Sequence, residues 1–126
     1  MKSIQESNRE AIDLVMAHLQ VWAEADDEKR MALAQRVYAE NVRVIDPEIV
    51  LNGQGEVSDF IGSLLKKSPG FKFQLTKRVE THHDMGILCW RFGLPSKPDT
   101  ITGEDIITMS EGRISSVLVF VDGATK

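Results

Sequence analysis

Residues 71–121, FKFQLTKRVETHHDMGILCWRFGLPSKPDTITGEDIITMSEGRISSVLVFV, contain four runs rich in β-branched and aromatic residues. The runs cover about residues 71–82, 86–94, 100–109 and 113–121, and turn-forming residues at 84–86, 95–99 and 110–112 separate them. Short links of this kind join neighbouring antiparallel strands. We therefore predict an antiparallel meander of four strands in the C-terminal part of the chain.

In the N-terminal part of the chain, a long helix is predicted over residues 4–25. Its apolar side chains recur every three or four positions and form one stripe of Ile12, Val15, Leu19 and Trp22. Asp26 or Asp27 then offers an oxygen to cap a second helix, which would carry Met31, Ala34, Val37 and Tyr38 on its apolar side. At about 1.5 Å per residue, the first helix is long enough to cross a small sheet.

A short strand and a third helix lie between these helices and the meander. The strand covers residues 41–46 and ends at Pro47, and an extended piece follows over residues 49–51. The third helix begins near Gly53 and Gly55 and presents an apolar stripe of Val57, Phe60, Ile61, Leu64 and Leu65. Helices first and a meander afterwards predict an α+β fold rather than alternating βαβ units.

Length and charge limit the classes of function. The 126 residues fit one domain, so we expect residues 1–126 to form a single domain. With 19 acidic and 15 basic residues the formal net charge is -4, which argues against a nucleic-acid partner. No apolar run approaches the roughly 20 residues that span a bilayer, and no secretory signal is recognisable at the start. We expect no membrane association and a cytoplasmic location, and the single cysteine, Cys89, agrees with a reducing compartment.

Three titratable side chains share the apolar face of their element. Asp46 follows Val42 and Val44 on one face of its strand, and Asp105 stands in a row with Ile101, Gly103, Ile107 and Met109. His18 lies one helical turn before Trp22. We predict that Asp46, Asp105 and His18 point into one enclosed space. The alternatives are a turn cap for Asp46, an outward row for Asp105, and a hydrogen-bonded core histidine for His18.

Further residues are candidates for the wall of that space: Trp22, Phe60, His82, Trp90, Arg91 and Phe120. His82 and His83 are adjacent in a strand, so at most one of them can face inward. Arg91 could pair with an internal carboxylate or form a surface ion pair. In the last strand we predict that Leu118 and Phe120 face inward. The outward face would then carry Val117, Val119 and Val121, an apolar surface on which a second copy could form a homodimer.

Several short motifs together resemble the SnoaL-like branch of the nuclear transport factor 2-like superfamily. They are WAEAD at 22–26, YAENVRVIDP at 38–47, GED at 103–105, SEGRI at 110–114 and VFVD at 119–122. The resemblance implies a cystatin-like roll, in which a strongly curved mixed sheet wraps around the long N-terminal helix. It also covers members with very different activities, so fold alone decides little about function.

The resemblance is closest, at the level of the site, to ketosteroid isomerase. In that family an Asp before a Pro shuttles a proton, and Asp46 stands before Pro47. A second, protonated Asp donates a hydrogen bond, and Asp105 is at that place. Where the family has a Tyr on the first helix, this chain carries His18. The cyclase members have a His in the middle strand, a role that His82 could take.

These observations favour an acid–base enzyme that acts on a hydrophobic carbonyl compound without a metal ion or an organic cofactor. Asp46 would remove a proton next to the carbonyl group, while Asp105 and His18 stabilise the enolate oxygen. A second hypothesis is a hydrolase or dehydratase in which a carboxylate activates water. It requires a histidine or Arg91 to be hydrogen-bonded to one of the two Asp residues. A third is a non-catalytic ligand-binding or association module.

Overall fold

The computed structural model describes residues 3–123 and begins with the long helix α1 (Ile4–Ala23). The side chain of Ser3 caps the helix by accepting a hydrogen bond from the backbone N–H of Glu6 at 3.1 Å. Val15, His18 and Val21 are its buried residues. The predicted helix is confirmed, with its end two residues earlier than expected.

Two shorter helices follow, α2 (Asp27–Val37) and α3 (Gly53–Lys67). Asp26 is the cap of α2, because its side chain accepts from the backbone N–H of Lys29 at 2.9 Å. Tyr38 was expected on this helix, but it is the first residue of the next strand. No helix within residues 3–123 has the length and the apolar character needed to cross a membrane.

A mixed seven-stranded sheet forms the other layer. Its strands are β1 (Tyr38–Ile45), β2 (Val50–Asn52), β3 (Lys72–Leu75), β4 (Glu80–His82), β5 (Met85–Leu94), β6 (Lys97–Ser110) and β7 (Arg113–Val121). The order is β2-β1-β7-β6-β5-β3, with β4 also paired to β5, and only the pair of β1 and β7 is parallel. The predicted α+β class and the antiparallel meander of β5, β6 and β7 are confirmed.

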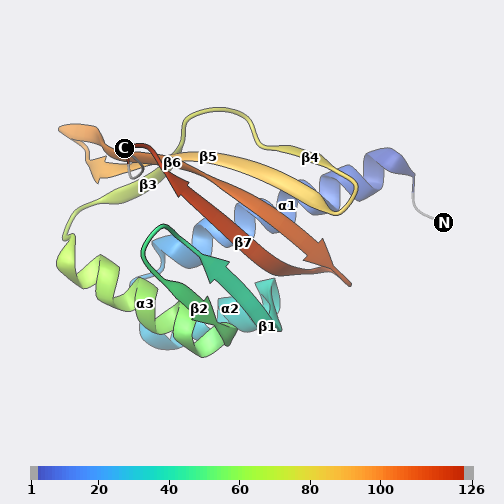
Figure 1. Ribbon diagram of the computed structural model, residues 1–126, viewed down its shortest axis with the longest axis horizontal. Helices are drawn as coiled ribbons and strands as arrows, with labels where there is room; N and C mark the ends of the chain where they lie inside the picture. The colour runs from blue at the N-terminus through green and yellow to red at the C-terminus, as the bar shows by residue number, and fades with distance from the viewer. Residues whose placement is uncertain (1–2, 124–126) are drawn as a thin grey trace.

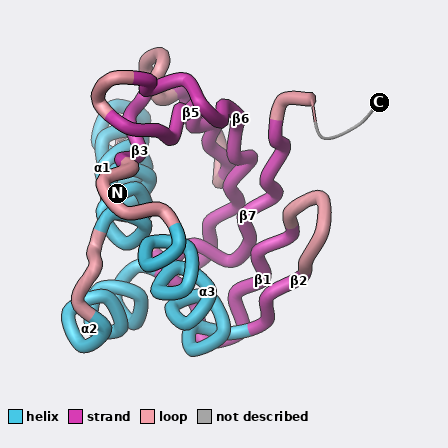
Figure 2. Tube along the Cα trace, turned by 90° about the vertical axis from the view of Figure 1, so that its left-hand side faces the viewer, coloured by secondary structure: helices cyan, strands magenta, loops and turns pink. Residues whose placement is uncertain are grey.

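The sheet curves around the helices. In Figure 1 the helix α1 passes behind β5, β6 and β7, and α3 lies beside β1 and β2. Figure 2 shows the helices gathered on one side of the molecule and the strands bending over them. The concave face of the sheet and the buried stripe of α1 therefore enclose the interior, as expected for a curved sheet around a long helix.

The predicted strand over residues 71–82 is two strands, β3 and β4. Both pair with β5: Leu75 lies opposite Trp90, and Glu80 lies opposite Ile87. Four residues, 76–79, therefore face only two residues of β5, so the chain must leave the ladder between them. Lys77 stands in the row of Phe73, Leu75 and Val79, so the alternation of apolar residues is interrupted between the two strands.

The inward and outward faces of β7 are the reverse of the prediction. Val119 pairs with Asp105, which places both side chains on the concave face, whereas Phe120 is 57% exposed on the convex face. A register shift near Thr108 adds one residue to β7, so Ile114 and Val117 are both fully buried. Because β7 is apolar on both faces, its alternation alone could not show which face is inside.

Candidate active site

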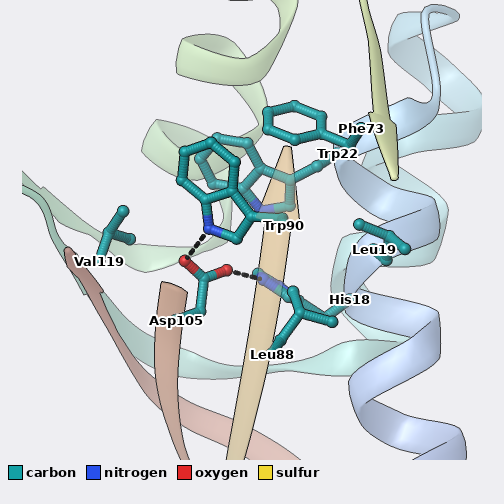
Figure 3. Close-up of a pocket in the computed structure, with 8 residues that line it drawn as sticks. All are labelled: His18, Leu19, Trp22, Phe73, Leu88, Trp90, Asp105 and Val119. Atoms are coloured by element: carbon teal, nitrogen blue, oxygen red, sulfur yellow. Dashed lines mark hydrogen bonds and ion pairs between the residues drawn. The ribbon is translucent and has the colours of Figure 1, made fainter. Parts of the chain in front are cut away.

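A small hollow lies between α1 and the concave face of the sheet. Its walls are His18, Leu19, Trp22, Phe73, Leu88, Trp90, Asp105 and Val119 (Figure 3). Its volume is about 30 Å³, which leaves room for about two water molecules at most. Apart from His18 and Asp105, the wall is built from apolar and aromatic side chains, so a charge in this place is poorly screened by water.

Asp105 is the polar centre of this hollow. Its Oδ2 lies 2.9 Å from Nε2 of His18, and its Oδ1 accepts from the indole N–H of Trp90 at 2.9 Å (Figure 3). Asp105 is 6% exposed and His18 is 1% exposed. The predicted inward row of β6 is therefore correct at Asp105, and the hydrogen-bonded partner that we required for a water-activating carboxylate is present in His18.

The position of Trp90 depends on a glycine in the neighbouring strand. Gly103 lies opposite Trp90 in the ladder, and a Cβ atom at residue 103 would stand 2.6 Å from the indole ring. The missing side chain lets the indole lie across β6 and reach the carboxyl group of Asp105, two residues further along the strand. Gly103 was expected only as a member of the apolar row.

Tyr38 joins the site from β1, and the sequence reasoning missed it. Its hydroxyl lies 2.5 Å from Nδ1 of His18 and accepts from the indole N–H of Trp22 at 3.0 Å. Burial raises the pKa of Tyr38 well above its ordinary value, so the hydroxyl keeps its proton. The available signal was that Tyr38 directly precedes a strand pattern, where aromatic residues are common.

Asp46 lies next to a second hollow rather than in the first. Its Oδ1 accepts from the backbone N–H groups of Glu48 and Ile49, both at 2.8 Å, so it does form the turn cap that was the alternative. It also lines a space of about 30 Å³ together with Val44, Ile49, Leu51, Phe60, Trp22 and Val119. The two interior hollows share the side chains of Trp22 and Val119.

A surface groove continues from the second hollow. The groove runs between β2 and α3, has a volume of about 600 Å³, and shares Ile49, Leu51 and Phe60 with the hollow at Asp46. The rings of Phe60 and Trp22 meet edge to face with centroids 6.1 Å apart. The groove, the hollow at Asp46 and the hollow at His18 and Asp105 therefore follow one another from the surface inward. Phe60 lies between the groove and the second hollow, and Trp22 lies between the two hollows.

Three predicted wall residues lie elsewhere. His82 is exposed on β4, where its Nδ1 is 3.0 Å from that of His83, and neither ring lines an interior hollow. Arg91 is on the convex face and contacts Gln74 and Asp99 at 3.1 and 3.4 Å, which is the surface-pair alternative. Phe120 is on the same convex face. Side chains in a strand alternate between its two faces, so in each case the neighbouring residue points inward instead.

The polar groups of the interior can accept and transfer protons. Oδ1 of Asp105 accepts from an indole N–H, Oδ2 is within hydrogen-bond distance of the imidazole of His18, and His18 connects the carboxyl group to a hydroxyl. No three His, Cys, Asp or Glu side chains within residues 3–123 are close enough together to hold a metal ion. The arrangement is a hydrogen-bonded carboxylate–imidazole pair in an apolar wall, with a second carboxylate in the adjoining hollow.

Comparison with known proteins supplies the fold context. No family model and no curated protein matches the sequence. A solved structure of a proposed isomerase of the SnoaL-like family from Agrobacterium tumefaciens is 31% identical with a TM-score of 0.84, over 91% of this chain and 99% of that one.

Two further structures share the fold at low identity. A proposed SnoaL-like polyketide cyclase from Jannaschia is 13% identical, with a TM-score of 0.75 over 97% of this chain and 90% of that one. A proposed ketosteroid isomerase from Kribbella flavida is 16% identical, with a TM-score of 0.71 over 94% and 82%. At these identities the likeness concerns the fold alone.

Proposed function

We propose, because this chain belongs to the SnoaL-like family, that its interior binds a small hydrophobic carbonyl compound and moves a proton on it. The observation that carries the proposal is the pair of His18 and Asp105, joined at 2.9 Å in an apolar hollow with Asp46 in the next hollow. Buried titratable groups that face free space are typical of acid–base sites.

The two carboxyl groups have different surroundings, which supports different roles. Asp46 is half-buried, and its Oδ1 accepts from two backbone N–H groups at the side from which the surface groove leads inward. It is the candidate base for a C–H bond next to the carbonyl. His18 lies deeper, where its imidazole N–H would donate to the oxygen of the enolate as charge develops, and Asp105 would hold that imidazole in place.

The ligand must be small and largely apolar, because the lining of both hollows is apolar and each has a volume of only about 30 Å³. Pockets for compounds of drug size have roughly 300 to 1,000 Å³. A ligand that reaches from Asp46 to Asp105 therefore has to displace Trp22, whose indole lies between the two hollows. We propose that this displacement accompanies binding.

The test is exchange of carbon-bound hydrogen for deuterium in a panel of hydrophobic ketones and enones, followed by mass spectrometry. Asp46→Asn is expected to lower the exchange rate by about 100-fold or more. Asp99→Asn is the matched control, because Asp99 is an exposed carboxylate on the convex face. Equal exchange by the Asp46→Asn variant and the wild type would remove Asp46 from the reaction.

A second candidate function is favoured by one observation, the direct bond between His18 and the carboxylate of Asp105 in a hollow that has room for water. Such a pair can activate a water molecule for hydrolysis or hydration. Incorporation of oxygen from labelled water into an epoxide panel separates the two functions. Hydrolysis would be lost in Asp105→Asn and retained in Asp46→Asn.

We also propose that two copies pair through the convex face of the sheet. Ladder partners place an apolar row of Ile87, Ile106, Leu118, Ile45 and Val50 across five strands of that face, and Phe120 is exposed beside it. Sedimentation at micromolar concentration should give a dimer that Leu118→Lys converts to a monomer. Ile4→Lys, at an exposed position of α1, should remain dimeric, and a monomeric wild type would end this proposal.

A further inference from the structure

Tyr38 lies at the end of a chain of hydrogen-bonded side chains that continues to Asp105. The side chain is fully buried, and its hydroxyl is within hydrogen-bond distance of Trp22 Nε1 and His18 Nδ1. The rings of Tyr38 and His18 meet edge to face, with centroids 5.7 Å apart. Residues 3–123 place no other hydrogen-bond partner on this hydroxyl.

The indole of Trp22 fixes the direction of this chain, because an indole N–H can only donate. The hydroxyl of Tyr38 accepts that hydrogen bond, and its own single proton must go to the remaining partner, Nδ1 of His18. In the reverse arrangement both Trp22 and His18 would donate to the hydroxyl. Its proton would then be buried without an acceptor, which is costly.

The direction of these hydrogen bonds also determines the state of Asp105, at the other end of the chain of side chains. If Nδ1 of His18 accepts, the neutral imidazole carries its proton on Nε2 and donates to Oδ2 of Asp105. The indole of Trp90 donates to Oδ1. Both oxygens of Asp105 accept, so the group is an ionised carboxylate in this arrangement. Within residues 3–123 no buried side-chain nitrogen or oxygen is left without a partner.

We infer that Tyr38 is a positioning residue, which with Trp22 holds His18 as the neutral tautomer with its proton on Nε2 and thereby presents Asp105 as a carboxylate. The inference deepens the proposed function, on which its importance rests, since it concerns the same pair of side chains. It differs from the expectation that Asp105 is protonated. The tautomer itself is measurable without any substrate.

The experiment is nitrogen NMR of the imidazole ring near neutral pH in the full-length protein. His82→Gln with His83→Asn gives a background in which His18 is the only histidine; both replaced side chains are exposed, and Asn tolerates the positive φ of 52° at residue 83. The expected spectrum has Nδ1 at the position of an unprotonated ring nitrogen and Nε2 at that of a protonated one. A protonated Nδ1 would overturn the inference.

Two variants in the same background test the roles of the aromatic donors. Tyr38→Phe keeps the ring and removes the hydroxyl, so the two nitrogen signals should move towards the averaged positions of a tautomer mixture. Trp90→Phe is the matched control, because it removes an indole N–H from Asp105 without touching Tyr38, and the tautomer should persist. Unchanged signals in a folded Tyr38→Phe protein would show that Tyr38 does not set the tautomer.

Absence of hydrogen exchange in the ketone panel would contradict the proposed function but would leave this spectrum, and the assignment of the tautomer, intact. The two ideas therefore fail separately.

Discussion

Arg30 and Asp105 are both charged side chains in the interior, 2% and 6% exposed, but their surroundings differ. Every nitrogen of the Arg30 guanidinium donates to an oxygen: Nε to Ser58, Nη1 to the backbone of Glu24 and Ala25, and Nη2 to Asp27. These partners join α3 to the corner between α1 and α2. Arg30 lines none of the hollows described above, whereas Asp105 and His18 border one.

A buried charge alone therefore does not mark a functional site. The Arg30 cluster uses its hydrogen bonds to hold three helices together and presents no free surface to a ligand. The cluster around Asp105 is equally well bonded, but it faces space that a small molecule could enter. Substitutions in the first cluster should therefore affect stability, and substitutions in the second should affect chemistry.

The largest effect on stability is expected for Arg30→Met, which leaves the backbone oxygens of Glu24 and Ser58 without their donor. We expect the free energy of unfolding to fall by about 3 kcal/mol. Urea unfolding measures this change, and Arg36→Met in the exposed part of the same helix should stay within about 0.5 kcal/mol. A large loss of exchange activity in the remaining folded protein would contradict the structural role.

Asp105→Asn should have a smaller effect on stability and a larger one on activity. The amide keeps the shape of the carboxyl group, but its NH₂ must face either Trp90 or His18, both of which donate in the native arrangement. We expect a loss of about 2 kcal/mol in unfolding free energy and about 100-fold in exchange rate. If the ratio of lost activity to lost stability were the same in Asp105→Asn as in Arg30→Met, the two clusters would not have separate roles in chemistry and stability.

Gly62→Ala perturbs the Arg30 cluster from the side of α3. A Cβ atom at residue 62 would lie 2.7 Å from Nη2 of Arg30, and this crowding outweighs the better helix propensity of alanine. We expect a net loss of about 1 kcal/mol in thermal unfolding. Gly55→Ala in the same helix meets nothing within 4 Å and should gain about 0.5 kcal/mol. A gain in both variants would show that the guanidinium moves aside at no cost.

The smallest effect concerns pH. The hydrogen bond and charge of Arg30 lower the pKa of Asp27 below its ordinary value. The ionised carboxylate therefore stabilises the fold fully at any pH above the ordinary pKa. This stabilisation is lost as the pH falls through the lowered pKa of the folded state. The Tm of Asp27→Asn should therefore fall less steeply below about pH 4 than that of the wild type. Asp59→Asn, an exposed carboxylate on α3, should follow the wild-type curve.

Periodicity was sufficient to predict the fold class and the face of Asp105. Gly103, Asp105, Ile107 and Met109 are all buried, as the alternation in β6 indicates, and the stripe of α1 places His18 against them. The family resemblance carried by residues 22–122 is confirmed by the structure from Agrobacterium tumefaciens. These features depend on local pattern, which a single sequence contains.

Other features depend on partners that are distant in sequence. Arg30 is buried because Ser58 and Asp27 bond it, and nothing in the helix pattern around it indicates this. Tyr38 contacts His18 and Trp22 only after α2 turns back into β1. The prediction for the inward face of β7 was wrong because the strand is apolar on both faces. Only its register with β6 decides which of its side chains point inward.

Trp22 connects the shape of the interior to the location of a proton. Its ring separates the two hollows, and its N–H bonds to Tyr38. A molecule that occupies both spaces must move the ring and so break that bond, whereas one that fills a single space can leave it in place. Thermodynamic linkage then requires the preferred tautomer of His18 to affect the affinity for long ligands and not for short ones.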